Sequence, residues 1–148
     1  MRLETNADIA LELHIAGYQF PDNHAAEYDS NWLVIEGRVR HPRGDWTFRD
    51  PCLLTYEAAR LADWLESVAA SCEASPHAGF IEPNLSFEVV MAEVGRVLHV
   101  VLTFEASPPW ATHDEEVVIE FPVKELNLTE AIGEWRAQLA QFPQRAER

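Results

Sequence analysis

The chain of 148 residues carries 25 acidic and 11 basic side chains, a formal net charge of −14. A field of this sign repels phosphate backbones, which argues against nucleic acid as a partner, and it attracts basic proteins and speeds their encounter. Acidity also keeps a protein soluble without any partner. Because 47% of the residues are hydrophobic, the chain suits one domain with a real core over residues 1–148.

Neither a targeting segment nor a disulfide framework is expected. Three acids interrupt the apolar residues of the segment 1–17, and no window approaches roughly 18 apolar residues, so we expect a cytoplasmic protein without a membrane span. Cys52 and Cys72 flank a predicted helix that would hold them about 25 Å apart, beyond the ~7 Å reach of a disulfide. Free buried thiols are therefore expected.

Alternating apolar residues predict three strands near the start of the chain. The first covers residues 9–16 and the second residues 32–39. The segment "HPRGD" (41–45) is typical of a hairpin turn into a third strand, which begins at Trp46 and is expected to end at Pro51.

A helix follows, with Thr55 as its expected N-cap and "ASPHAG" (74–79) as its end. The second half of the chain repeats the alternating pattern, and three further strands are predicted: residues 85–92, 97–105 and 116–123. A second helix is predicted to begin at Asn127, because Glu130 stands at capping-box spacing from it.

The predicted order is βββα-βββα. Consecutive strands joined by short turns pair antiparallel, and helices then pack on the sheet. We therefore predict an α+β fold in which one antiparallel sheet of about six strands carries two helices.

No pattern in the sequence is typical of catalysis. There is no nucleophile elbow, no Gly-rich phosphate loop, and no metal-ligand spacing among the six histidines. We therefore expect a protein that is not an enzyme and that uses no cofactor and no metal.

The first acidic cluster lies in the loop after the first predicted strand. Asp22, Glu27 and Asp29 stand there with His24, and a metal site, a catalytic cluster and a solvated loop are the alternatives. The loop lacks the alternating acids and the final glutamate of a calcium-binding EF-hand. We interpret the three acids as surface available to a partner.

The second acidic cluster follows Trp110 and consists of Asp114, Glu115 and Glu116. Three adjacent carboxylates are typical of a solvated loop tip. A tryptophan beside carboxylates is also typical of a binding hot spot. We predict these four residues as partner contacts.

Six segments distributed over nearly the whole chain resemble the WapI-type immunity proteins of bacterial contact-dependent toxin systems. The segments are "GYQFPD" (17–22), "YDSNWLVIEGRV" (28–39), "WTFRDPCLLTYEAARLADWLE" (46–66), "EPNLSFE" (82–88), "FEASPPW" (104–110) and "LAQFPQR" (139–145).

This resemblance implies a cytoplasmic antidote that binds the toxic C-terminal domain of a secreted protein, often a nuclease. Nucleases that grip RNA or DNA are basic, and an acidic protein can compete with phosphate for their surface. We therefore expect an immunity protein that neutralises a basic toxin domain by stoichiometric binding. The alternative is a non-enzymatic intracellular domain that binds another protein or a small ligand.

Overall fold

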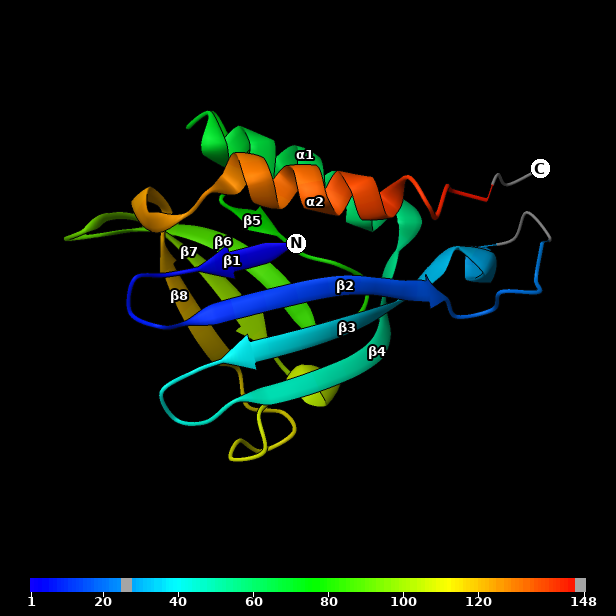
Figure 1. Cartoon of the computed structure of the whole chain (residues 1–148), viewed down its shortest axis with the longest axis horizontal. Helices are drawn as coiled ribbons and strands as arrows, with labels where there is room; N and C mark the ends of the chain where they lie inside the picture. Colours follow the sequence, from blue (N-terminus) through cyan, green and yellow to red (C-terminus); the bar gives the residue numbers. More distant parts are fainter. Residues whose placement is uncertain (25–27, 146–148) are drawn as a thin grey trace.

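The computed structural model describes residues 1–24 and 28–145, and these form two four-stranded antiparallel sheets (Figure 1). In each sheet the strands lie in chain order. Sheet A consists of β1 (Arg2–Glu4), β2 (Ala10–Tyr18), β3 (Trp32–Arg40) and β4 (Trp46–Leu54). Sheet B consists of β5 (His77–Ala78), β6 (Leu85–Ala92), β7 (Gly95–Leu102) and β8 (Val117–Pro122).

Each sheet is followed by a helix, α1 (Thr55–Ala69) after sheet A and α2 (Leu128–Leu139) after sheet B. The two helices lie side by side along the sheets (Figure 1). Short 3-10 helices occur at residues 28–31, 104–106 and 123–125. Each half of the chain is thus a four-stranded meander that ends in a helix.

The predicted α+β class is confirmed, but the single sheet of about six strands is wrong, because the described residues form eight strands in two sheets. The strands that the sequence did not predict are β1 and β5, which have 3 and 2 residues and are too short to show a period-two pattern. The two meanders do not pair edge to edge. Their apolar faces are instead buried in one shared core.

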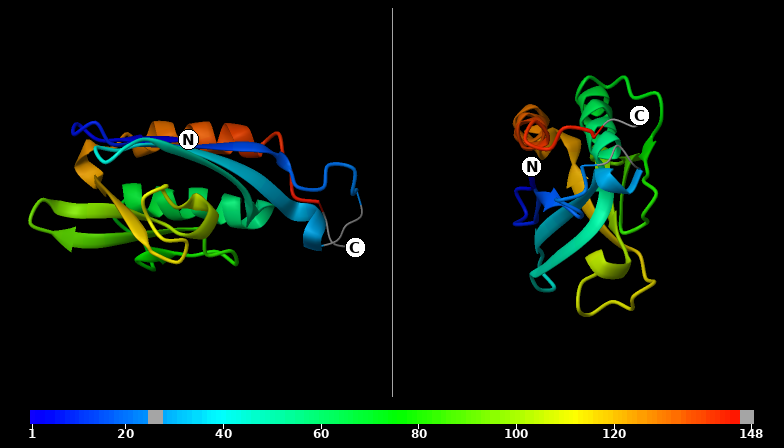
Figure 2. Two further views of the ribbon diagram at one scale, coloured as in Figure 1. Left: turned by 90° about the horizontal axis from the view of Figure 1, so that it is seen from below. Right: turned by 90° about the vertical axis from the view of Figure 1, so that its right-hand side faces the viewer.

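That core runs continuously through both sheets and both helices. Seen end-on, the sheets form two walls and the helices lie across one open side (Figure 2). Leu13 and Ile35 from sheet A and Phe87 and Phe121 from sheet B are each at most 1% exposed. Burying side chains of this size contributes roughly 1.5–3 kcal/mol each, so the shared core is the main source of stability.

Trp135 joins the two halves. It is completely buried, and its indole Nε1 donates a hydrogen bond to the backbone oxygen of Ala58 at 2.8 Å, which connects α2 to α1. At the exposed edge of the same helix pair, Arg136 lies 2.9 Å from the carboxylate of Asp63 and 3.0 Å from that of Glu66. Exposed ion pairs of this kind add little to stability, so the tryptophan dominates this contact.

The start of α1 differs from the prediction. The N-cap is Leu54, and Thr55 is the first helical residue, whose hydroxyl donates to the side-chain oxygen of Asn31. The buried carboxylate of Glu57 satisfies the helix start instead, because it accepts the N–H of Leu54 at 3.0 Å. Its second oxygen accepts the N–H of Ile81 at 2.9 Å, which fixes the segment leading to β6.

Pro51 does not end the third predicted strand, which is β4 in the structure. β4 continues through it to Leu54, and the pairing register between β3 and β4 shifts beside it, between Leu33 and Ile35. A bulge of this kind accommodates a residue that has no N–H to donate.

Both cysteines are free, as expected, but only Cys52 is buried. Burial raises the pKa of its thiol to about 12, with smaller contributions from nearby acids. The expectation of two buried thiols is wrong for Cys72, which is exposed because α1 ends at Ala69.

Gly37 provides a test of the core. Phe48 is its partner in register, and the phenylalanine ring occupies the space that a side chain at position 37 would fill. We expect Gly37→Ala to lower the free energy of unfolding by about 1–3 kcal/mol, measured by urea denaturation. The matched control is Gly133→Ala in α2, where a Cβ meets nothing within 4 Å. The Gly133→Ala control should be more stable than the native chain by about 0.5–1 kcal/mol. Equal effects at the two sites would contradict this packing.

Candidate partner-binding surfaces

The first acidic loop connects β2 to the 3-10 helix at residues 28–31. Asp22 and Asp29 are exposed, whereas Glu27 lies outside the described residues. The C-terminal segment holds the loop, because the guanidinium of Arg145 donates to backbone oxygens at both of its ends. The acceptors are Phe20, Pro21 and Asn23 in the loop and Ser30 in the 3-10 helix that follows it. The same guanidinium lies 3.7 Å from the centroid of the Tyr18 ring. Segments 17–22 and 139–145, both part of the family resemblance, therefore meet in space.

The aromatic side chains around this loop differ in their packing. Phe20 and Tyr28 are 44% and 42% exposed. Tyr18 anchors the end of β2, because its hydroxyl donates to the backbone oxygen of Pro143 and its ring contacts Phe142 edge-on.

Trp110, predicted to be a contact beside the second acidic cluster, is half-buried against sheet A. Its ring meets the Trp46 ring edge-on at a centroid distance of 5.1 Å, and the guanidinium of Arg43 lies 5.2 Å from its centroid. The indole thus covers the turn between β3 and β4.

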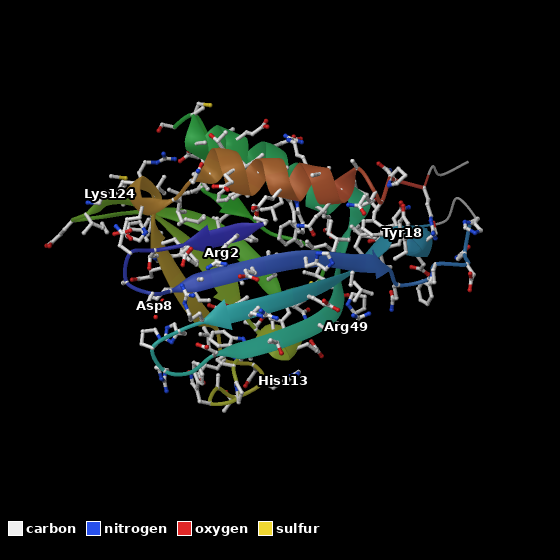
Figure 3. All side chains as sticks on the ribbon, viewed as in Figure 1. Arg2, Asp8, Tyr18, Arg49, His113 and Lys124 are labelled. Atoms are coloured by element: carbon white, nitrogen blue, oxygen red, sulfur yellow. The ribbon has the colours of Figure 1, made fainter. Side chains whose placement is uncertain are left out.

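The three carboxylates that follow Trp110 in the chain, those of Asp114, Glu115 and Glu116, are all exposed. They belong to the loop between the 3-10 helix at 104–106 and β8, where Figure 3 labels His113.

Asp114 and Glu116 line a hollow of about 330 Å³ beside sheet B, which we call the acidic hollow. Its apolar lining includes Phe80, Leu85, Val101 and Phe104. Within the described part of the chain, neither carboxylate has an ion-pair partner. The hollow therefore combines apolar walls with unpaired negative charge.

Phe104, which lines the acidic hollow, has an unusual backbone conformation. The predicted strand over residues 97–105 ends earlier, because β7 stops at Leu102 and Phe104 adopts a left-handed φ of 50°. This conformation costs a non-glycine residue roughly 1–2 kcal/mol. A hydrogen bond from the Phe104 N–H to the backbone oxygen of His113, 2.8 Å long, accompanies it.

The outer face of sheet B carries a row of alternating histidines and glutamates across its four strands. His77 Nδ1 lies 3.4 Å from Glu88 Oε2, and Glu88 Oε1 lies 3.2 Å from His99 Nδ1. His99 Nε2 in turn lies 3.4 Å from Glu120 Oε1. Sequence reasoning missed this row because its members are at least 11 positions apart and only the strand register aligns them.

The outer face of sheet A carries arginines instead, and most of them are neutralised. Arg2 pairs with Glu12 at 2.8 Å, Arg40 pairs with Glu4 at 2.6 Å, and Arg49 pairs with Glu36. Figure 3 shows Arg2 and Arg49 on this sheet. Arg38 has no ion pair among the described residues. The outer face of sheet A is therefore close to neutral, and the excess of acidic residues lies elsewhere on the molecule.

A polar cluster around the buried Asn84 connects the two sheets near the start of the loop before β8. Asn84 is 2% exposed, and its Nδ2 donates to Asp50 at 3.2 Å and to Glu105 at 2.8 Å. Burial, followed by repulsion from Glu105 and Glu82, raises the pKa of the Asp50 carboxyl above its ordinary value.

In the described ranges 1–24 and 28–145, no group of three or more His, Cys, Asp or Glu side chains is arranged to hold a metal ion. No helix in the same ranges has the length and apolarity needed to span a membrane.

Comparison with known families agrees with the resemblance read from the sequence. The model of the "Immunity protein WapI-like family" matches residues 2–143, nearly the full length of the chain. No curated protein and no solved structure matches the chain.

The raised pKa of Asp50 predicts a pH-dependent stability. In the window above the unfolded carboxyl value of about 3.9, the folded chain keeps a proton that the unfolded chain has released, so stability falls as pH rises. Asp50→Asn removes this titration, and its amide oxygen can still accept from Asn84. We therefore expect its stability relative to the native chain to increase between about pH 3 and pH 7, measured by urea unfolding. The exposed variant Glu93→Gln, measured in parallel, is the control for removing one carboxylate from the chain. If Asp50→Asn changes the stability by the same amount at every pH, the raised pKa of Asp50 is contradicted.

Proposed function

The chain belongs to the WapI-like immunity protein family, and from this membership we propose that it is an antidote that binds a cognate toxin domain. The match over residues 2–143 is the observation that carries the proposal. The antidote acts in the cytoplasm of the cell that makes it, by forming a one-to-one complex, and it performs no chemistry of its own.

We further propose that the toxin is a basic nuclease domain. The net charge of −14 supports this, because a nuclease that grips RNA or DNA needs a positive surface. An acidic antidote is attracted to that surface and competes with phosphate for it. Such attraction speeds association chiefly at low ionic strength, since salt screens charges separated by more than about 8–10 Å.

Asp114, Glu115 and Glu116 are the first candidates for toxin contacts, and Trp110 supports their loop by its packing on sheet A. Asp22, Glu27 and Asp29 form the second candidate patch. Exposed carboxylates such as those of Asp22, Asp29 and Asp114 contribute more to the rate and selectivity of encounter than to the stability of the antidote.

A co-expression experiment tests the function. The toxic C-terminal domain encoded next to the gene for this chain is induced in a sensitive host, with and without the antidote. We expect growth only with the antidote, together with a one-to-one complex on purification. An unrelated acidic protein of similar size is the control for non-specific charge effects. Continued killing in the presence of folded antidote would refute the proposal.

Charge reversal tests the first patch. Replacing Asp114, Glu115 and Glu116 by lysine should slow association with the toxin domain at least about tenfold at low salt, because steering is lost. Thermal stability should not fall, because the three side chains are exposed. Stopped-flow association rates at several salt concentrations measure the effect, with Asp22→Lys/Asp29→Lys as the comparison. An unchanged rate would remove this patch from the interface.

A further inference from the structure

The acidic hollow opens on the outer face of sheet B. Strand register places Ser86, Val101 and Val118 in one row across β6, β7 and β8, and both Ser86 and Val101 line the hollow. Val118 is 40% exposed, which is high for a branched apolar side chain in a strand. The hollow and this row form one surface with apolar side chains at its centre.

The segment that supplies most of this surface is strongly acidic. Residues 85–120 contain seven acids and one arginine, Arg96, besides the histidines His99 and His113. Arg96 is already engaged, because its guanidinium lies 2.7 Å from Glu73 and donates to the backbone oxygen of Val68. No cation of the described chain therefore neutralises the carboxylates of Asp114 and Glu116.

Apolar walls beside unpaired carboxylates match a long cationic side chain. The methylene groups of arginine or lysine pack on apolar surface while the charged end stays at a polar rim. Arginine fits best, because its planar guanidinium stacks on aromatic rings and pairs with carboxylates through two donors, and Phe80 and Phe104 line the hollow. A hollow of about 330 Å³ is at the small end of ligand pockets and suits one side chain.

We propose that the hollow and the adjoining row of sheet B are the docking surface for the toxin domain, and that an arginine side chain of the toxin enters the hollow. The proposal rests on the proposed function and specifies its surface. The opposite outer face, that of sheet A, is a poorer match for a cationic partner, because its carboxylates already pair with arginines of the chain.

A titration without the toxin tests the chemistry of the hollow. Isotope-labelled protein is titrated with N-acetyl-arginine amide and, separately, with its neutral isostere N-acetyl-citrulline amide, and backbone amide shifts are followed by NMR. We expect saturable shifts at Val101, Phe104 and residues 114–116 with a Kd in the millimolar range, and at least threefold smaller shifts with citrulline. Equal responses to the two amides, or shifts spread over all acidic surfaces, would overturn the proposal.

Isosteric neutral variants locate the effect. Asp114→Asn/Glu116→Gln should abolish the saturable arginine shifts and keep the melting temperature, whereas Asp22→Asn/Asp29→Asn should leave them unchanged. Persistence of the shifts in the first variant would show that the cation binds elsewhere and would overturn the assignment.

A second pair of variants tests docking of the toxin. Ser86→Arg supplies the hollow with an arginine of the antidote itself, and Thr47→Arg places the same side chain on the exposed outer face of sheet A. We expect Ser86→Arg to weaken toxin binding at least tenfold and to lose protection, while Thr47→Arg still protects.

If the Ser86→Arg variant binds the toxin domain with native affinity and still protects the host, the proposed docking surface is overturned, while the antidote function stands. Failure of the unmodified chain to protect would instead refute the function and, with it, docking of a toxin at this surface.

Discussion

The two meanders each have one apolar face, and the molecule depends on burying both faces in the same core. Leu13 and Ile35 on one sheet share this core with Phe87 and Phe121 on the other. Trp135 completes it and connects the helices through its bond to the Ala58 backbone. Because the inner faces and the helix stripes are used for folding, the outer faces and the loops are what the molecule presents to a partner.

These outer faces differ in electrostatics, although both belong to a strongly acidic chain. On sheet A, pairs such as Arg2 with Glu12 and Arg40 with Glu4 cancel charge locally. Such exposed pairs contribute only about 0–1 kcal/mol each to stability. Their larger consequence is that the negative field of the molecule arises elsewhere, chiefly along sheet B and the loop before β8. Our proposal that a basic toxin docks on sheet B therefore also depends on this pairing on sheet A.

Two unfavourable local features lie near the start of the loop before β8. Phe104 adopts a left-handed backbone, and the half-buried Asp50 lies in a polar cluster where the pKa of its carboxyl is raised. Conflicts with local rules are expected where function rather than stability sets the arrangement. The stability of the shared core makes such conflicts tolerable, since each costs little compared with the apolar surface that the core buries.

Local patterns in the sequence were sufficient for the α+β class, for six of the strands, for both helices and for the Asn127–Glu130 cap, because periodicity and capping act over neighbouring residues. Local patterns do not specify how distant strands align or which faces meet. Only the tertiary structure therefore separated the strands into two sheets, packed Trp110 against Trp46, and placed Asp114 and Val101 around the same hollow. The acidity of the loop before β8 follows directly from its composition. The apolar walls beside it come from residues far away in the chain, which strand register and packing bring there.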